Sequence, residues 1–306
     1  MGIFSRKPKV DVVVDRSWDD PELDSAFQAT RDGDLEAGRA LLKATPQCTD
    51  LRCLRVTGLG RAAVGHGEQL ETQLMESPQD PDLLLWLAQT KVFEAWAARR
   101  RPIAEAATFR TLLESARLIL WDAVEAAQDD SAPWAVLQSV ALGLEVPLED
   151  KQYVFNQGLV RQPDCYAVHA GRVQVLAPRS GGSLDDLIRF GQEAANRAKP
   201  GRALNAINAL VQAELNADPQ GQHKVDQFKP AVLAARAAWL QPDRQAEPYD
   251  LEAHSAFAYV LRLYREPELA MEHVDAMQGR ITTQPWGYEG DESVVFSEAF
   301  AKGMRV

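Results

Sequence analysis

The sequence of 306 residues is poor in cysteine and in positive charge, and it lacks long apolar runs. Its three cysteines, Cys48, Cys53 and Cys165, cannot all pair within one chain. This excludes a dense disulfide framework and favours a reducing cytosol. Lysine and arginine number 33 against 44 acidic residues, so the net charge is -11. Nucleic-acid binding without sequence preference needs clustered cations, and we therefore expect no nucleic-acid partner.

Apolar segments are too short for a membrane span or a secretory signal. The run at residues 83–88 is far below the roughly 20 residues that cross a bilayer. Near the N-terminus, three valines at 12–14 are flanked by Asp11 and Asp15, whereas a signal needs roughly 7–15 apolar residues. We expect a cytoplasmic protein without a membrane span.

What the sequence does contain is helical periodicity along almost its whole length. No stretch keeps the period-two alternation of strands, and the longest apolar stripe at helical spacing covers residues 107–127. Asp20-Pro21 is typical of a helix start. The spacing predicts further helices over 34–43, 49–64, 83–98 and 292–302.

Between residues 131 and 198 the predicted helices come in pairs. Trp134-Ala-Val and Tyr166-Ala-Val stand 32 residues apart, each shortly after a proline. This spacing is close to the period of about 34 residues in tetratricopeptide arrays. Similar pairs are predicted at 203–240 and 248–278. The predicted fold is all-α: a tetratricopeptide-like helical-hairpin solenoid or superhelix, a right-handed stack of antiparallel helix pairs. The predicted organisation is a flexible tail at 1–18, a helical-repeat domain at 19–280 with a sub-boundary near 100–107, and an aromatic loop with a capping helix at 281–306.

Residues 109–215 resemble a group of bacterial, largely actinobacterial, tetratricopeptide-like proteins of unknown function. The resemblance is carried by the stripe at 109–127, by Asp130-Ser-Ala-Pro-Trp134 and by Arg179-Ser-Gly-Gly-Ser-Leu-Asp-Asp-Leu187. Ser180 stands where that group usually has Trp, and Leu184 where it usually has His. The resemblance implies a helical fold and transfers no activity.

The glycines at 181 and 182 are expected to supply positive φ angles at a turn between two helices. Ser183 and Asp186 then match a capping box that opens the second helix. Asp185-Asp186 also resembles part of a magnesium motif, but Arg189 stands where a third carboxylate would be. The helix dipole already favours acidic residues in a first turn.

Two further patterns favour structural roles. Gly58-Leu-Gly60-Arg-Ala-Ala63 fits a dinucleotide-binding pattern, yet it lies in a predicted helix rather than after a strand. Cys165 and His169 share a helix face and could ligate a metal, although a buried thiol beside a core histidine is the preferred interpretation. His254 is expected at the edge of the core, and His273 in an exposed context. We expect no cofactor and no metal.

Six residues are candidates for contacting a partner or an anion. Arg99, Arg100 and Arg101 end a predicted helix before a proline, where they also complement the helix dipole. Arg179 precedes the glycine turn. Trp286 and Tyr288 lie in the aromatic loop, where capping of the last helix pair is favoured over an exposed recognition tip.

The leading hypothesis is a non-catalytic interaction module whose partner is an unidentified protein or peptide. One alternative is a helical enzyme or small-molecule binder that uses interior polar residues such as Asn205, Asn208, His169 and His254. Another is an acidic inhibitor or immunity-type protein, which would need one connected acidic face.

Overall fold

The computed structural model describes residues 12–100, 106–219, 221 and 226–303, with side chains up to residue 300. Within these ranges the protein is all-α, with fifteen α-helices. The remaining regular structure consists of short 3-10 turns and two strands of two residues, β1 (Val13–Val14) and β2 (Arg280–Ile281). None of the described helices has both the length and the apolar character needed to cross a bilayer.

The helices predicted from periodicity are present, with ends within two residues of the predicted ones. In chain order the helices are α1 (Pro21–Arg31), α2 (Leu35–Ala44), α3 (Asp50–Ala62), α4 (Gly67–Glu76), α5 (Pro81–Arg99), α6 (Ala106–Ala126), α7 (Ala132–Gly143), α8 (Leu148–Arg161), α9 (Tyr166–Leu176), α10 (Leu184–Arg197), α11 (Ile207–Ala217), α12 (Lys229–Trp239), α13 (Asp250–Leu263), α14 (Pro267–Met277) and α15 (Glu292–Gly303). The predictions did not include α4, because Leu70 is its only fully buried side chain.

Local capping explains where several helices begin. The Asp20 carboxylate accepts hydrogen bonds from the backbone N–H groups of Glu22 and Leu23 at 3.0 and 3.2 Å, and Pro21 occupies the first helical position. The Ser183 hydroxyl accepts from the Asp186 N–H at 3.1 Å and donates to the Asp186 carboxylate at 2.7 Å. The predicted Ser183 cap is therefore present, but Asp186 accepts from the Ser183 hydroxyl and not from its backbone N–H, as a full capping box would require. Asp186 also pairs with Arg189 at 3.2 Å.

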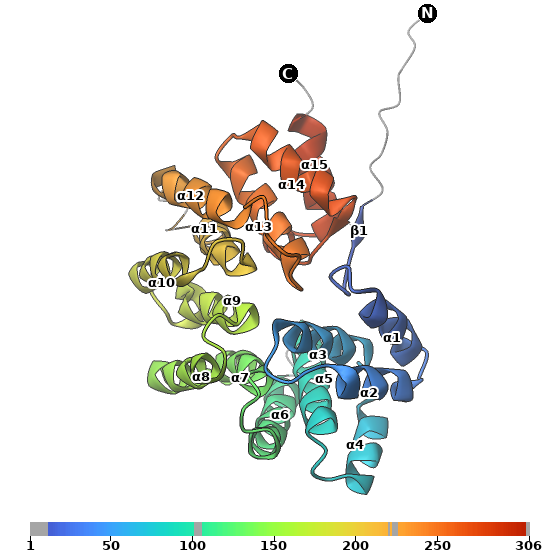
Figure 1. Ribbon diagram of the computed structural model, residues 1–306. Helices are drawn as coiled ribbons and strands as arrows, with labels where there is room; N and C mark the ends of the chain where they lie inside the picture. The colour runs from blue at the N-terminus through green and yellow to red at the C-terminus, as the bar shows by residue number, and fades with distance from the viewer. Residues whose placement is uncertain (1–11, 101–105, 220, 222–225, 304–306) are drawn as a thin grey trace, which may run out of the picture.

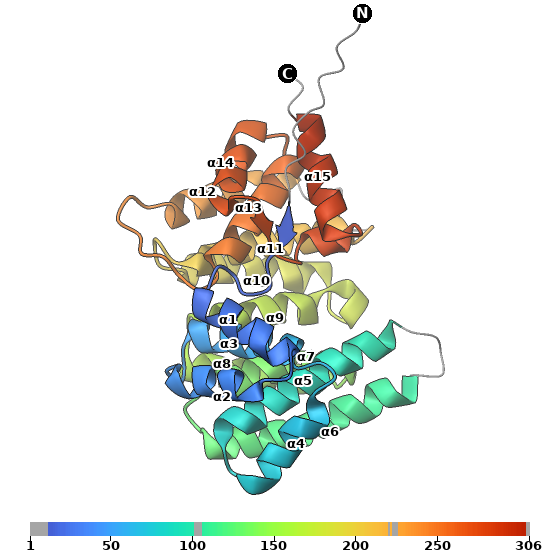
Figure 2. The same cartoon turned by 90° about the vertical axis from the view of Figure 1, so that its right-hand side faces the viewer.

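The helices follow an arc from α1–α6 through α7–α10 to α11–α15 (Figure 1). Each odd-numbered helix from α1 to α11 contacts the next odd-numbered one, so these helices form a continuous layer. Neighbours in the chain pack together as pairs, among them α5 with α6, α7 with α8 and α13 with α14. One side of this odd-numbered layer faces the inside of the arc, and we call this side the inner face. Figure 2 shows the molecule turned by 90°.

The N-terminal segment joins the two ends of this arc. Strand β1 pairs in parallel with β2, with Val13 opposite Arg280. The Val13 N–H donates to the Gly279 carbonyl at 2.9 Å, and Asp19 forms an ion pair with Arg280. Residues 12–18 of the predicted tail are therefore attached to the C-terminal helices, whereas residues 1–11 lie outside the described part of the chain.

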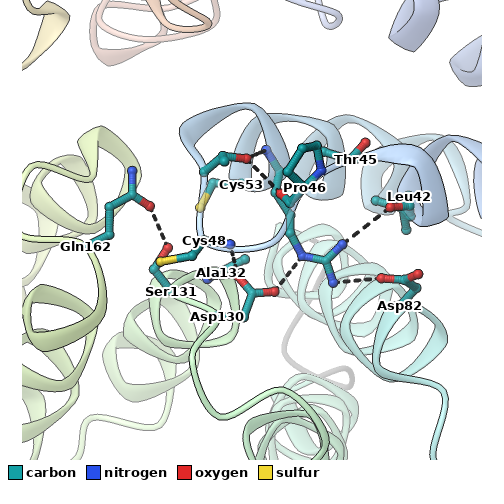
Figure 3. A network of polar contacts seen from close by, with 12 residues as sticks. Leu42, Thr45, Pro46, Cys48, Cys53, Asp82, Asp130, Ser131, Ala132 and Gln162 are labelled. Atoms are coloured by element: carbon teal, nitrogen blue, oxygen red, sulfur yellow. Dashed lines mark hydrogen bonds and ion pairs between the residues drawn. The ribbon is translucent and has the colours of Figure 1, made fainter.

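A buried ionic network ties α3, α5 and α7 together near their N-terminal ends (Figure 3). The Arg52 guanidinium contacts Asp130 at 2.5 Å and Asp82 at 2.7 Å, and both Arg52 and Asp130 are almost fully buried. Asp130 also accepts from the N–H groups of Cys48 and Ala132 at 3.2 and 3.1 Å. Because its oxygens satisfy three donors, this buried carboxylate fixes the entry to α7.

The two glycines after η2 (Pro178–Ser180) have different roles. Gly181 has φ +84°, in the left-handed region, as the sequence predicted. Gly182 does not have a positive φ, which corrects the prediction. Instead, a Cβ on Gly182 would overlap the backbone carbonyl of Leu176, so the turn needs glycine there for space.

His273 was expected to be exposed, but it is 1% exposed on α14. Its Nδ1 lies 2.9 Å from the Nδ1 of His254, and its Nε2 accepts from the Arg236 Nε–H at 2.8 Å. Nδ1 of His273 must then carry the proton and donate to His254. The His273 ring stacks on the buried Trp239, and the His254 ring lies edge-on to it. Helix packing therefore buries a residue that its local sequence context placed at the surface.

Candidate functional site on the inner face

A cavity of about 300 Å³ lies on the inner face, which we call the inner cavity. Its walls come from α3, α5, α7, α9 and α13, and residues 15–18 and 282–284 close one side. The aromatic side chains of Trp18, Phe93 and Trp96 line it and are only half-buried. Gln89, Ser139 and Gln174 add hydrogen-bonding groups to the wall. A volume near the low end for ligand pockets suits one or two side chains of a partner.

Two acidic residues, Asp15 and Glu252, line this cavity, and Glu252 contacts its aromatic wall. Its Oε2 accepts a hydrogen bond from the Trp18 indole N–H at 3.0 Å. Burial raises the pKa of Glu252, and the Trp18 N–H offsets part of that rise by favouring the ionised carboxylate. Tyr249 lies beside it, stacked on Tyr166 with ring centroids 4.5 Å apart. The cavity wall thus combines aromatic faces with the partly buried carboxyl group of Glu252.

Arg61 brings a cation to the opposite part of the inner cavity. Its guanidinium lies over the Phe93 ring, 5.0 Å from the centroid, and donates to Thr283 at 3.4 Å. Burial lowers the pKa of Arg61 to about 10, and the nearby Arg16 adds to the effect. The group remains cationic at neutral pH because this value is still well above 7.

A second, larger hollow of about 670 Å³ lies next to the inner cavity, and we call it the basic groove. Trp96 and Gln174 line both, so the two spaces share a wall. The groove lies between the end of α5, the α7–α8 turn and the end of α9 with η2. Its ionisable lining residues are Arg99, Lys151, Arg179 and Glu145.

Each cation of the basic groove is held in a defined way. The Arg99 guanidinium lies 5.3 Å from the centroid of Trp96 and 5.0 Å from that of Phe109. The Lys151 ammonium donates to the Ser180 carbonyl at 3.1 Å. Cation–π contacts and a single carbonyl bond orient these groups without neutralising their charge.

An ion pair with a buried carboxylate holds Arg179 in place. It forms an ion pair with Glu214, which is 1% exposed, and donates to Gln174 at 3.0 Å. Its guanidinium also lies 5.4 Å from the centroid of the Tyr288 ring. Burial raises the pKa of Glu214, and Arg179 is the strongest of the groups that oppose this rise. The pair fixes the arginine at the groove wall.

The structure brings together only part of the predicted contact set. Arg99 and Arg179 line the same groove, and Tyr288 lies under Arg179. Arg100 is exposed after α5 but does not line the groove, and Arg101 lies outside the described residues. Trp286 is fully buried against Tyr259, Phe296 and Phe300, because it covers the last helix pair. Its side chain therefore presents no surface to a partner.

Sequence reasoning missed Lys151, Trp96 and Glu252. Lys151 had one usable signal: it lies in the first turn of α8, where the helix dipole disfavours a cation. Such a residue is retained when tertiary contacts or a ligand need it. Trp96 and Glu252 had no such signal, because a site residue on a helix has the same spacing as the core and surface residues around it.

The remaining sequence candidates have structural explanations. Gly58 and Gly60 lie inside α3, where a Cβ on Gly58 would come within 2.8 Å of Leu23 and one on Gly60 would overlap Gln89. Cys165 is buried, and its Sγ lies 3.9 Å from that of Cys53. The Nδ1–H of His169 donates to the Cys165 carbonyl at 2.8 Å. Across the described residues, no three His, Cys, Asp or Glu side chains converge as metal ligands.

Comparison of the chain with protein-family models, with curated proteins and with solved structures finds no match. The site is therefore interpreted from its own geometry.

Proposed function

We propose that the protein is a tetratricopeptide-like helical-repeat module that binds a protein or peptide segment along its inner face. Support for the repeat architecture comes from the paired helices and from the continuous contacts of successive odd-numbered helices. Stacked helical pairs cover each other's apolar faces and leave one extended surface for recognition. The three cysteines are free thiols, which is compatible with a reducing cytosol as the place of action.

The observation that carries this proposal is that the inner cavity and the basic groove are neighbours with a shared wall, formed by Trp96 and Gln174. Together they offer half-buried aromatic faces, at Trp18, Phe93 and Trp96, next to hydrogen-bonding and charged groups. Anchor side chains of protein partners typically enter pockets of this composition, with polar groups at the rim. An elongated space suits a chain segment better than a compact metabolite.

The alternatives have less support. A small-molecule site was expected from Asn205, Asn208, His169 and His254, and none of these lines the inner cavity or the basic groove. Asn205, for example, donates to the carbonyls of Lys199 and Arg202. An acidic inhibitor would present a connected acidic face, but three cations and one carboxylate line the groove.

Selection of a random peptide library displayed on phage, with the purified chain as bait, tests the proposal. We expect enriched peptides that bind the wild type with micromolar Kd in fluorescence anisotropy. Trp96→Ala and Phe93→Ala should each weaken binding at least tenfold, since they remove aromatic contacts in the inner cavity.

Trp121→Ala is the matched control, because Trp121 is 37% exposed on α6, outside both hollows. It should bind as the wild type does. Failure to enrich any peptide, or equal loss in Trp96→Ala and Trp121→Ala, would contradict the proposed function. Circular dichroism of each variant confirms that its helices are intact.

A further inference from the structure

The charge of the basic groove is opposite to that of the chain. The protein carries a net charge of -11, yet three of the four ionisable side chains that line this groove are cationic. An acidic protein that concentrates positive charge in one hollow attracts anions there and repels them elsewhere. The positive charge of the groove therefore indicates an anionic partner, which the composition of the chain alone does not.

Two of these cations have no carboxylate bound to them in the described structure. Among the described residues, Arg99 lies over the rings of Trp96 and Phe109, and Lys151 donates to a backbone carbonyl. Lys151 is only 6% exposed. Glu145 raises the pKa of Lys151 but forms no ion pair with it among the described residues. A ligand carboxylate that contacts this largely buried ammonium is therefore favoured.

A further buried cation lies behind the groove. Arg172 is 4% exposed, and its Nη1 atom has no hydrogen-bond partner among the described residues. Its Nη2 donates to Gln152, which is neutral. Its positive charge lowers the pKa of Lys151, after the larger effect of burial. The positive potential of the groove therefore extends below its surface.

We infer that the inner face binds an acidic peptide segment, whose carboxylates contact Arg99 and Lys151 in the basic groove while a neighbouring apolar side chain enters the inner cavity beside Trp96. This inference rests on the proposed function and names the chemistry of the partner. Arg179 stands at the same wall, fixed by Glu214, and adds a guanidinium to the recognition surface.

The lining favours a peptide over a nucleic acid. Leu142, Val146 and Leu148 also line the groove, and Leu148 is 42% exposed. A peptide can place apolar side chains on them, whereas a phosphate backbone cannot. Glu145 also lines the groove and would repel a continuous polyanion. Spaced carboxylates separated by apolar residues match this pattern of charge.

The test uses the peptides enriched by the wild-type chain. We expect them to be rich in Asp and Glu beside an aromatic or aliphatic residue. Arg99→Gln and Lys151→Met should each weaken the tightest such peptide at least tenfold in anisotropy titrations. The affinity should also fall as sodium chloride rises from 50 to 300 mM, because charge pairing is screened. Arg99 is exposed, so its substitution keeps the test independent of folding.

Arg197→Gln is the control for loss of one positive charge. Arg197 lies on α10 and does not line the groove; its side chain is 60% exposed, and its ion pair with Glu193 is long, at 4.0 Å. Its variant should bind as the wild type does.

The outcomes separate the two proposals. If no peptide is enriched, both are overturned. If the enriched peptides are neutral or basic, or bind equally after their Asp and Glu are changed to Asn and Gln, only the acidic-partner inference is overturned. The same holds if Arg99→Gln and Lys151→Met behave like Arg197→Gln. A single-stranded oligonucleotide of equal charge that binds more tightly than the peptide also overturns it.

Discussion

The indole N–H of Trp18 donates a hydrogen bond to the Glu252 carboxylate at 3.0 Å, across 234 positions of sequence. The ring of Trp18 also lies edge-on to Tyr249, with centroids 6.5 Å apart. Together with the pairing of β1 and β2, this contact connects the segment before α1 with the C-terminal helices. It also places an aromatic ring in the wall of the inner cavity. One residue thus contributes both to closure of the arc and to the candidate site.

Trp18→Phe removes this N–H and keeps most of the ring. We expect a loss of about 1–3 kcal/mol in the free energy of unfolding at pH 8, because a buried carboxylate loses its donor. The indole N–H lowers the pKa of Glu252, so its removal raises that pKa further. The loss should be smaller at pH 5, where more Glu252 is protonated. Urea unfolding followed by circular dichroism at both pH values measures it.

Trp121→Phe is the control, since Trp121 lies on α6 and is partly exposed. Phenylalanine keeps a ring at the edge-on contact with Trp134, and any change in the free energy of unfolding should be the same at pH 5 and pH 8, because this contact involves no ionisable group. Equal losses in Trp18→Phe at pH 5 and pH 8 would show that the hydrogen bond to Glu252 does not depend on its ionisation.

Local signals in the sequence predicted the helices well, and they predicted the site only in part. Apolar spacing and caps such as Asp20 and Ser183 act within a few residues, so helix ends are readable from the chain. The pairing of β1 with β2 and the contact of Trp18 with Glu252 join distant segments, for which two-residue strands give no periodic signal. Arg99 and Arg179 were both suspected, but only the packing of α5 against α7 and of α7 against α9 brings them to one groove.

The histidine pair makes the protein sensitive to acid. Burial lowers the pKa of His254 to about 4 and that of His273 to about 2. Because both values lie below the pKa of about 6.5 in the unfolded chain, the unfolded state binds more protons, and stability falls as pH drops from about 6.5 towards 4. Between pH 7 and 4.5, the free energy of unfolding of the wild type should fall by at least about 2 kcal/mol more than that of the double variant His254→Phe/His273→Leu.

Urea unfolding of both proteins across this pH range measures the difference. Buried carboxyl groups with raised pKa values, such as Asp50, change stability in the opposite direction, but they are common to both proteins and cancel. Parallel pH profiles for wild type and double variant would contradict the role given to the pair.

Asp50 has a structural role that does not require its charge. Its Oδ1 accepts from the Tyr166 N–H at 2.8 Å and so caps α9, whose own N-cap residue, Cys165, makes no such bond. Burial raises the pKa of Asp50 to about 6. The folded state then binds more protons than the unfolded state between about pH 4 and 6, and stability is lost as pH rises through that window.

Asp50→Asn keeps the acceptor and removes the charge. We expect it to be more stable than the wild type by up to about 3 kcal/mol at pH 7.5, and by only about 1 kcal/mol at pH 4.5. Asp50→Ala should instead lose about 1–2 kcal/mol at pH 4.5, because the cap is gone. Chemical unfolding at the two pH values measures these differences. If Asp50→Asn were less stable than the wild type at pH 7.5, the carboxylate charge would be needed.

The turn between α9 and α10 tests the two glycine roles separately. At Gly181, alanine must adopt φ +84°, which costs about 1 kcal/mol for a single residue. At Gly182, the added Cβ overlaps the Leu176 carbonyl, so the backbone that carries Arg179 must move. We expect Gly182→Ala to lose more stability than Gly181→Ala, by at least about 1 kcal/mol, in urea unfolding. Because η2 also supplies the Ser180 carbonyl to Lys151, Gly182→Ala should weaken peptide binding as well, and Gly181→Ala should not. Equal stability of the two variants would mean that the turn can shift without cost and that only the left-handed φ at Gly181 constrains it.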